Sequence, residues 1–169
     1  VVDWHRETGV SVIASEAANN SAFSRSSFIR ALDIVKKSSH AVFCDCGNGI
    51  PHPANRGSVQ LADTLVFPGN AASGDSLRDI TNTMKQYSDP KFKMAEKVKQ
   101  GVIVIVGAKE SERRTYAHHY DFPIERVFTI PTNRYMAGDN IVSLSRVPLR
   151  IRVILLEILV AILKAERIS

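Results

Sequence analysis

The chain lacks the glycine-lysine phosphate loop with which many proteins hold a nucleoside triphosphate. None of its nine glycines is followed by lysine, so the pattern G-x-x-x-x-G-K-[ST] does not occur in the 169 residues. These residues by themselves therefore offer neither the amide cradle nor the paired lysine of that device.

Cysteine is equally scarce. Cys44 and Cys46 are the only two in the sequence, and they flank Asp45. On a strand they point to the same face, too close in sequence for an unstrained disulfide. This usage fits a reducing, cytoplasmic setting. Further zinc ligands at a suitable spacing are missing, so we interpret the two thiols as small buried core residues.

Long hydrophobic runs and blocks of one charge are also absent. The most apolar stretch, residues 151–163, is interrupted by Arg152 and Glu157 and is too short to span a bilayer. The net charge is +5, but the basic residues are spread along the chain, which permits an acidic partner without requiring one. Because the sequence starts at Val1 without a methionine or a leader, we expect it to be part of a longer protein.

Apolar, β-branched runs alternate with helical patterns along the chain. The runs predict strands over residues 10–14, 41–44, 64–67, 102–106 and 126–130. The patterns between them predict helices from Ser24 to about 40, over 53–62, from Ser73 or Asp75 to before Pro90, and over 111–119. Residues 87–100 are interpreted as a polar connection. This alternation predicts a single α/β domain over residues 1–169, with a parallel sheet and helices on both faces.

A last helix is predicted to begin at Pro148. Its apolar residues follow helical spacing, so we expect this helix to dock on the sheet and not on a membrane. The predicted docking stripe consists of Ile151, Ile154, Leu155, Ile158, Leu159 and Ile162.

The most informative stretch surrounds Asp45. An apolar run over residues 41–44 predicts a strand buried on both faces, with Asp45 at its carboxyl end, where open α/β sheets bind ligands. Gly47 and Gly49 follow and let the backbone approach a bound group closely. A carboxylate capping the next helix and a tight strand-to-helix turn remain the alternative interpretations.

An ordered set of motifs resembles the C-terminal two-thirds of a ParA/MinD-like ATPase. The set comprises the D-x-x-x-G spacing from Asp45 to Gly49, the Ala-Asp pair at Asp63, the strand over residues 102–106 and the Ile-Pro turn at Pro131. The wording Asp-Cys-Gly-x-Gly, followed by His-Pro-Ala, is most similar to MinD-like proteins associated with type VII secretion.

The resemblance implies a P-loop NTPase-like fold that lacks its Walker A segment. It implies that Asp45 is the catalytic and metal-binding residue, holding Mg²⁺ through water, and that Gly47 and Gly49 face the terminal phosphate. Pro131 and Thr132 would contribute to the purine pocket. The longer protein would bind ATP and Mg²⁺, form a homodimer and position cargo in DNA partition, cell division or secretion, in the cytoplasm or at a membrane through partners. The chain alone is expected to bind no cofactor and to leave ATP intact.

Two other functions stay open. The chain has Gly107 and Ala108 where many relatives place an adenine-contacting Asn, and Thr132-Asn133 where relatives often end a two-residue step in Asp. These departures favour a MinD-like scaffold that has lost nucleotide binding. The basic composition permits a module that binds DNA without sequence preference, whose affinity would fall steeply with salt.

Overall fold

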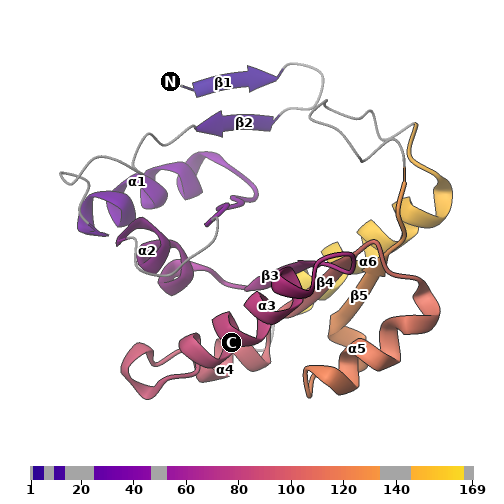
Figure 1. Cartoon of the computed structure of the whole chain (residues 1–169). Coiled ribbons are helices and arrows are strands. Elements are labelled where there is room, and N and C mark those ends of the chain that lie inside the picture. Colours follow the sequence, from indigo (N-terminus) through magenta and orange to yellow (C-terminus); the bar gives the residue numbers. More distant parts are fainter. Residues whose placement is uncertain (1, 6–9, 14–24, 47–52, 134–145, 166–169) are drawn as a thin grey trace. The chain divides into compact units, whose positions relative to one another are not determined.

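A computed structural model describes residues 2–5, 10–13, 25–46, 53–133 and 146–165. The chain forms two compact units, Val1–Leu61 and Ala62–Ser169, and each is described by itself (Figure 1).

The N-terminal unit contains a strand pair and a helix pair. Strand β1 (Val2–His5) pairs antiparallel with β2 (Val10–Ile13), while α1 (Arg25–Ser38) packs against α2 (Pro53–Leu61). Both helices confirm the sequence prediction. The expectation that residues 10–14 join a parallel sheet is wrong, because this run finds its hydrogen-bond partner in the strand just before it.

The predicted buried strand at residues 41–44 is also wrong. Residues 41–46 adopt no regular structure, and Phe43 is 79% exposed. A strand needs a neighbouring backbone to satisfy its N–H and C=O groups, and the described sheets offer no pairing to this run. Apolar composition alone therefore misled the prediction.

The C-terminal unit is built around a parallel sheet, which confirms the α/β fold. Strands β3 (Val66–Asn70), β4 (Val102–Val106) and β5 (Val127–Ile130) lie in the order β3-β4-β5, all parallel. The helices that flank it are α3 (Gly74–Tyr87), α4 (Ala95–Lys99), α5 (Arg113–His119) and α6 (Leu149–Ala165). Short 3-10 turns also connect these elements, among them η2 (Pro90–Phe92), η3 (Glu110–Glu112) and η4 (Ile124–Arg126).

One face of this sheet is covered by α6, which follows Pro148 and confirms the predicted docking (Figure 1). Side chains alternate along a strand, so Val102 and Val104 point to the same face. They form one buried cluster with Phe128 and Ile130 of β5, Val147, and the α6 residues Ile151, Ile154 and Ile158. Leu159 departs from the predicted stripe, because it is 42% exposed.

The opposite face carries α3 and α5. A Cβ built on Gly69 would lie 2.6 Å from Ile80 of α3 and 3.3 Å from Ile105, which places all three on this side. Helix α3 begins as predicted, since Ser76 N donates to the Oγ of the N-cap Ser73 at 3.2 Å. Ser111 does not cap α5 as expected and lies within η3 instead.

Residues 87–100 are more ordered than a polar connection. They form η2 and α4, and they bury Met94 and Val98. Gly101 then enters β4 in a confined space, where an added Cβ would lie 2.8 Å from Phe67 and 3.0 Å from the Leu65 carbonyl oxygen. The many lysines suggested a polar connection, but the hydrophobic residues between them are buried and hold this segment against the rest of the unit.

Tyr120, just after α5, links this layer to α3 and gives a pH-dependent stability. Its hydroxyl donates to the Leu77 carbonyl at 3.1 Å, and burial, with a smaller contribution from Tyr116, raises the pKa of Tyr120 to about 12. The folded state therefore favours the neutral phenol, so we expect the free energy of unfolding to fall as the pH rises from about 10 to 12. Urea titrations at successive pH values measure this. Tyr120→Phe should lower stability at pH 8 and flatten the alkaline loss; an equally steep loss in the variant would contradict the assignment.

Candidate functional site

The carboxyl ends of the three parallel strands meet at one edge of the sheet. Asn70, Val106 and Ile130 are in register there as the last residues of β3, β4 and β5. Open α/β sheets bind ligands outside this edge, because the chain leaves each strand there and frees backbone groups. The residues that follow the three strands are therefore the candidates for a site.

Gly107 lies at the centre of this edge. Its φ is +85°, a conformation that favours glycine, and its N–H donates to the Ile130 carbonyl at 2.7 Å. A Cβ placed on it would lie 3.6 Å from Asn70 Oδ1 and 3.7 Å from Thr132 Oγ1. The ends of all three strands thus come together, with polar side chains from the outer two facing a backbone that carries no side chain.

The turn after β3 is held in place by its own hydrogen bonds. Asn70 Oδ1 accepts from Ala72 N at 2.9 Å, and Asn70 N donates to Ser76 Oγ at 3.0 Å. These contacts bring the amino terminus of α3 to the strand end. Its N–H groups and the positive end of its dipole suit a polar or anionic group, although Asp75, paired with Arg78 at 3.3 Å, already places a carboxylate in the first turn.

The turn after β4 contributes charged side chains. The fully buried Thr129 donates to Glu110 Oε2 at 3.3 Å, and Arg113 Nη1 lies 3.4 Å from Glu110 Oε1. Arg113 also stacks over the Phe128 ring, 4.9 Å from its centroid. Glu110 is therefore oriented from two sides next to the edge, and its arrangement is that of a structural anchor.

Two of the residues predicted as ligand contacts lie at this edge. Pro131 is half-buried and Thr132 is exposed, directly after β5. Asp45 is an exposed residue of the irregular segment in the N-terminal unit. Gly47 and Gly49 lie outside the described residues. Sequence reasoning missed Asn70, whose signal was an amide side chain at a strand end followed by small residues and the Ser73 cap.

The cysteines differ from their predicted burial. Cys44 is exposed and Cys46 is half-buried; burial raises the pKa of the Cys46 thiol, and a hydrogen bond with Ser58 opposes that shift. Within the described ranges, no group of three or more His, Cys, Asp or Glu side chains could hold a metal ion. Among the described residues, Cys44 and Cys46 therefore belong to no metal-binding group.

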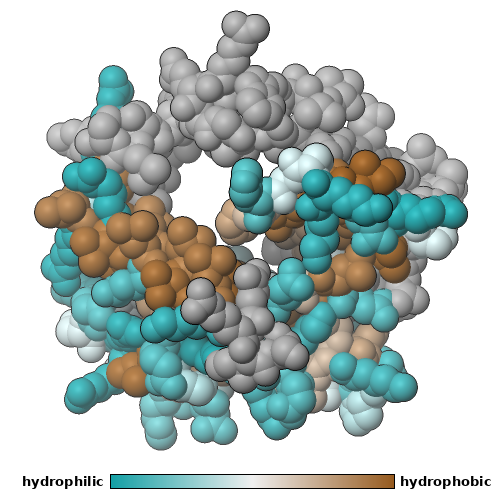
Figure 2. All heavy atoms as spheres, turned by 180° about the vertical axis from the view of Figure 1, so that it is seen from behind, coloured by the Kyte–Doolittle hydropathy of each residue, from teal (hydrophilic) through white to brown (hydrophobic). Residues whose placement is uncertain are grey.

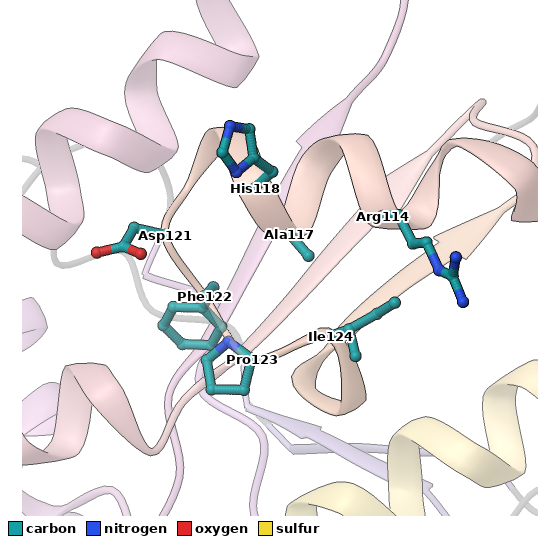
Figure 3. Close-up of a pocket in the computed structure, with 7 residues that line it drawn as sticks. All are labelled: Arg114, Ala117, His118, Asp121, Phe122, Pro123 and Ile124. Atoms are coloured by element: carbon teal, nitrogen blue, oxygen red, sulfur yellow. The ribbon is translucent and has the colours of Figure 1, made fainter.

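A shallow hollow of about 510 Å³ lies at the other end of α5 (Figure 3). It is lined by Arg114, Ala117, His118, Asp121, Phe122, Pro123 and Ile124. Arg114 points away from Asp121, and the ring of Phe122 lies beside Pro123 (Figure 3). Since α5 runs from the end of β4 to the start of β5, this hollow is at the amino end of the strands and separate from the candidate site.

Comparison with protein-family models, with curated proteins and with solved structures finds no match. Among the helices that the structure describes, none is both long enough and apolar enough to cross a membrane.

Proposed function

We propose that this chain is the C-terminal portion of a ParA/MinD-like, nucleotide-switched ATPase that positions cargo. The observation that supports this best is the meeting of Asn70, Gly107 and Thr132 at the carboxyl edge of a parallel sheet. This is where an open α/β sheet binds its ligand, and it is where the resemblance places the purine-side wall.

In this proposal the edge holds the base side of the nucleotide. Gly107 is exposed and carries no side chain, so a bound group can approach its backbone, while Asn70 and Thr132 offer an amide and a hydroxyl near it. Hydrogen bonds of this kind orient a bound base at a modest net gain in free energy. The chain thus supplies recognition, and phosphate binding depends on a segment beyond these residues.

In this proposal Asp45 takes the metal role that the resemblance implies. It is an exposed carboxylate. Such a group suits Mg²⁺, which keeps several of its waters and takes few carboxylates. When bound, Mg²⁺ would neutralise phosphate charge, and Asp45 would orient its hydration shell.

The test uses a protein that joins this chain to a phosphate loop. We expect Mg²⁺-dependent ATP binding by calorimetry, weakened about tenfold or more by Gly107→Ala, because a side chain is strained at this positive φ and the methyl group would lie against Asn70 and Thr132. Gly74→Ala is the matched control, since a Cβ there meets nothing within 4 Å. A folded protein that binds ATP equally well with either substitution would overturn the purine-side assignment.

One observation favours the second candidate, a MinD-like scaffold without nucleotide. Residues 41–46 adopt no strand, so Asp45 is not presented at the end of a buried strand as the resemblance implies. A longer protein that ignores ATP, and whose partner binding is insensitive to chelators, would support this function over the ATPase.

A further inference from the structure

Helix α6 has a second apolar face, on the side away from the sheet. Six large hydrophobic side chains are exposed along it, and a continuous hydrophobic band covers α6 at the left of Figure 2. These residues are Leu149 (68%), Val153 (45%), Leu156 (61%), Leu159 (42%), Val160 (47%) and Leu163 (49%). A helix docked on one side only would be expected to carry polar residues here.

The spacing of this face is that of a coiled-coil seam. Five of the six residues follow each other at intervals of four, three, four and three, with leucine and valine alternating. In a heptad written abcdefg, Val153 and Val160 then occupy a positions, and the leucines occupy d positions. A β-branched residue at a with Leu at d favours two parallel strands.

The same register separates the two faces of the helix. Ile151, Ile154 and Ile158, which dock on the sheet, fall at the outer positions f, b and f, while Leu159 falls at g and widens the seam. The face that holds α6 in the fold and the seam are therefore on opposite sides. Because the sheet already fixes the helix, its residues lose little conformational freedom when the seam is covered.

The charges beside the seam select a second copy in a parallel orientation. A g residue faces the e residue five positions later on a parallel partner, which pairs Arg152 with Glu157 of the second copy. An antiparallel pair would instead bring Arg150 toward Lys164 of the second copy and Glu157 toward Glu157 of the second copy. Both of these pairs have like charges.

We propose that the α6 seam, formed by Leu149, Val153, Leu156, Val160 and Leu163, is a homodimer interface. Two copies of this chain meet there through parallel α6 helices in register. The interface does not rest on the proposed function, because it uses neither the carboxyl edge of the sheet nor a nucleotide.

Sedimentation equilibrium of the 169-residue chain tests the interface. We expect a concentration-dependent dimer without nucleotide, with a dissociation constant raised at least about 30-fold by Leu156→Glu at the centre of the seam. Gln86→Glu, which adds the same charge at an exposed position of α3, should leave it unchanged. Far-UV circular dichroism checks folding, and Leu156→Ser repeats the test if the charged variant unfolds. A wild-type monomer at all concentrations, as expected if another part of the protein covers the seam, would overturn the proposal.

Charge reversal and cross-linking test the orientation. Arg152→Glu or Glu157→Arg alone should weaken the dimer, and the double variant should restore it. In a chain whose native cysteines are replaced by serine, Leu149→Cys should form a disulfide with the same position of the second copy. A cross-link only between Leu149→Cys and Leu163→Cys chains would show an antiparallel pair and overturn the parallel arrangement.

Discussion

Ile154→Asp is expected to lower the free energy of unfolding by about 3–5 kcal/mol, because it places an unpaired charge in the cluster between α6 and the sheet. Ile154 is 6% exposed and belongs to the same cluster as Val102, Val104 and Phe128. Small domains have a total stability of about 5–15 kcal/mol, so this single change removes a large part of it. Urea denaturation followed by circular dichroism measures the loss.

Val153→Asp is the matched control for this loss. Val153 is the preceding residue of the same helix, but it is 45% exposed and points away from the sheet. Its substitution should lower the free energy of unfolding by less than about 1 kcal/mol. The measurement uses dilute protein, so that seam contacts between copies do not contribute. Equal losses for the two variants would contradict the docking of α6 by its Ile151, Ile154 and Ile158 face.

The pH dependence separates charge from lost packing. A carboxyl group in this cluster has a raised pKa, so part of the Ile154→Asp cost should disappear below about pH 4, where the group is neutral in both states. Ile154→Asn, which has a similar shape and no charge, should show no such recovery. A pH-independent cost in both variants would assign the whole loss to packing.

The sequence predicted those parts of the fold that depend on local patterns. Residues 102–106 form a continuous apolar run, and β4 indeed lies at the centre of the sheet, fully buried at Val102, Ile103 and Ile105. Ser73 and Pro148 marked two helix starts correctly, because capping and a fixed φ act within one turn.

Strand pairing could not be predicted in the same way. The run at residues 41–44 has the composition of a buried strand, yet Phe43 is exposed, since composition does not supply a hydrogen-bond partner. Residues 10–13 do form a strand, but they pair with β1, whose sequence showed no comparable apolar run. In both cases the outcome depends on which backbone is available, which is a property of the tertiary structure.

The candidate site was predictable in part for the same reason. Pro131 and Thr132 were predicted as ligand contacts and lie at the carboxyl edge, because the end of β5 was predicted correctly. The role of Asn70 depends on the register that aligns it with Val106, and register is set by pairing across three strands. The second apolar face of α6 was not predicted, because the apolar residues of this helix were assigned to one docking stripe. Leu159 was part of that stripe but does not dock on the sheet.

Asp45→Ala is expected to lower kcat for ATP hydrolysis on the order of 10³-fold in a protein that joins this chain to a phosphate loop. The carboxylate is exposed, and in the proposed function it orients the hydration shell of Mg²⁺. Its loss would remove transition-state stabilisation without removing a buried side chain. Steady-state turnover at varied Mg²⁺ measures the effect, and the Mg²⁺ concentration for half-maximal activity should rise in Asp45→Asn, which keeps the shape but not the charge.

Asp63→Ala provides the matched control for this substitution. Asp63 is also an exposed aspartate, at the start of the C-terminal unit, and we assign it a structural role and not a metal role. Its substitution should change kcat less than about threefold, within the range of ordinary surface changes. Because Asp45 is an exposed side chain, the Asp45→Ala protein should unfold at nearly the same urea concentration as the parent. A folded Asp45→Ala protein with unchanged turnover and unchanged Mg²⁺ dependence would remove Asp45 from the site.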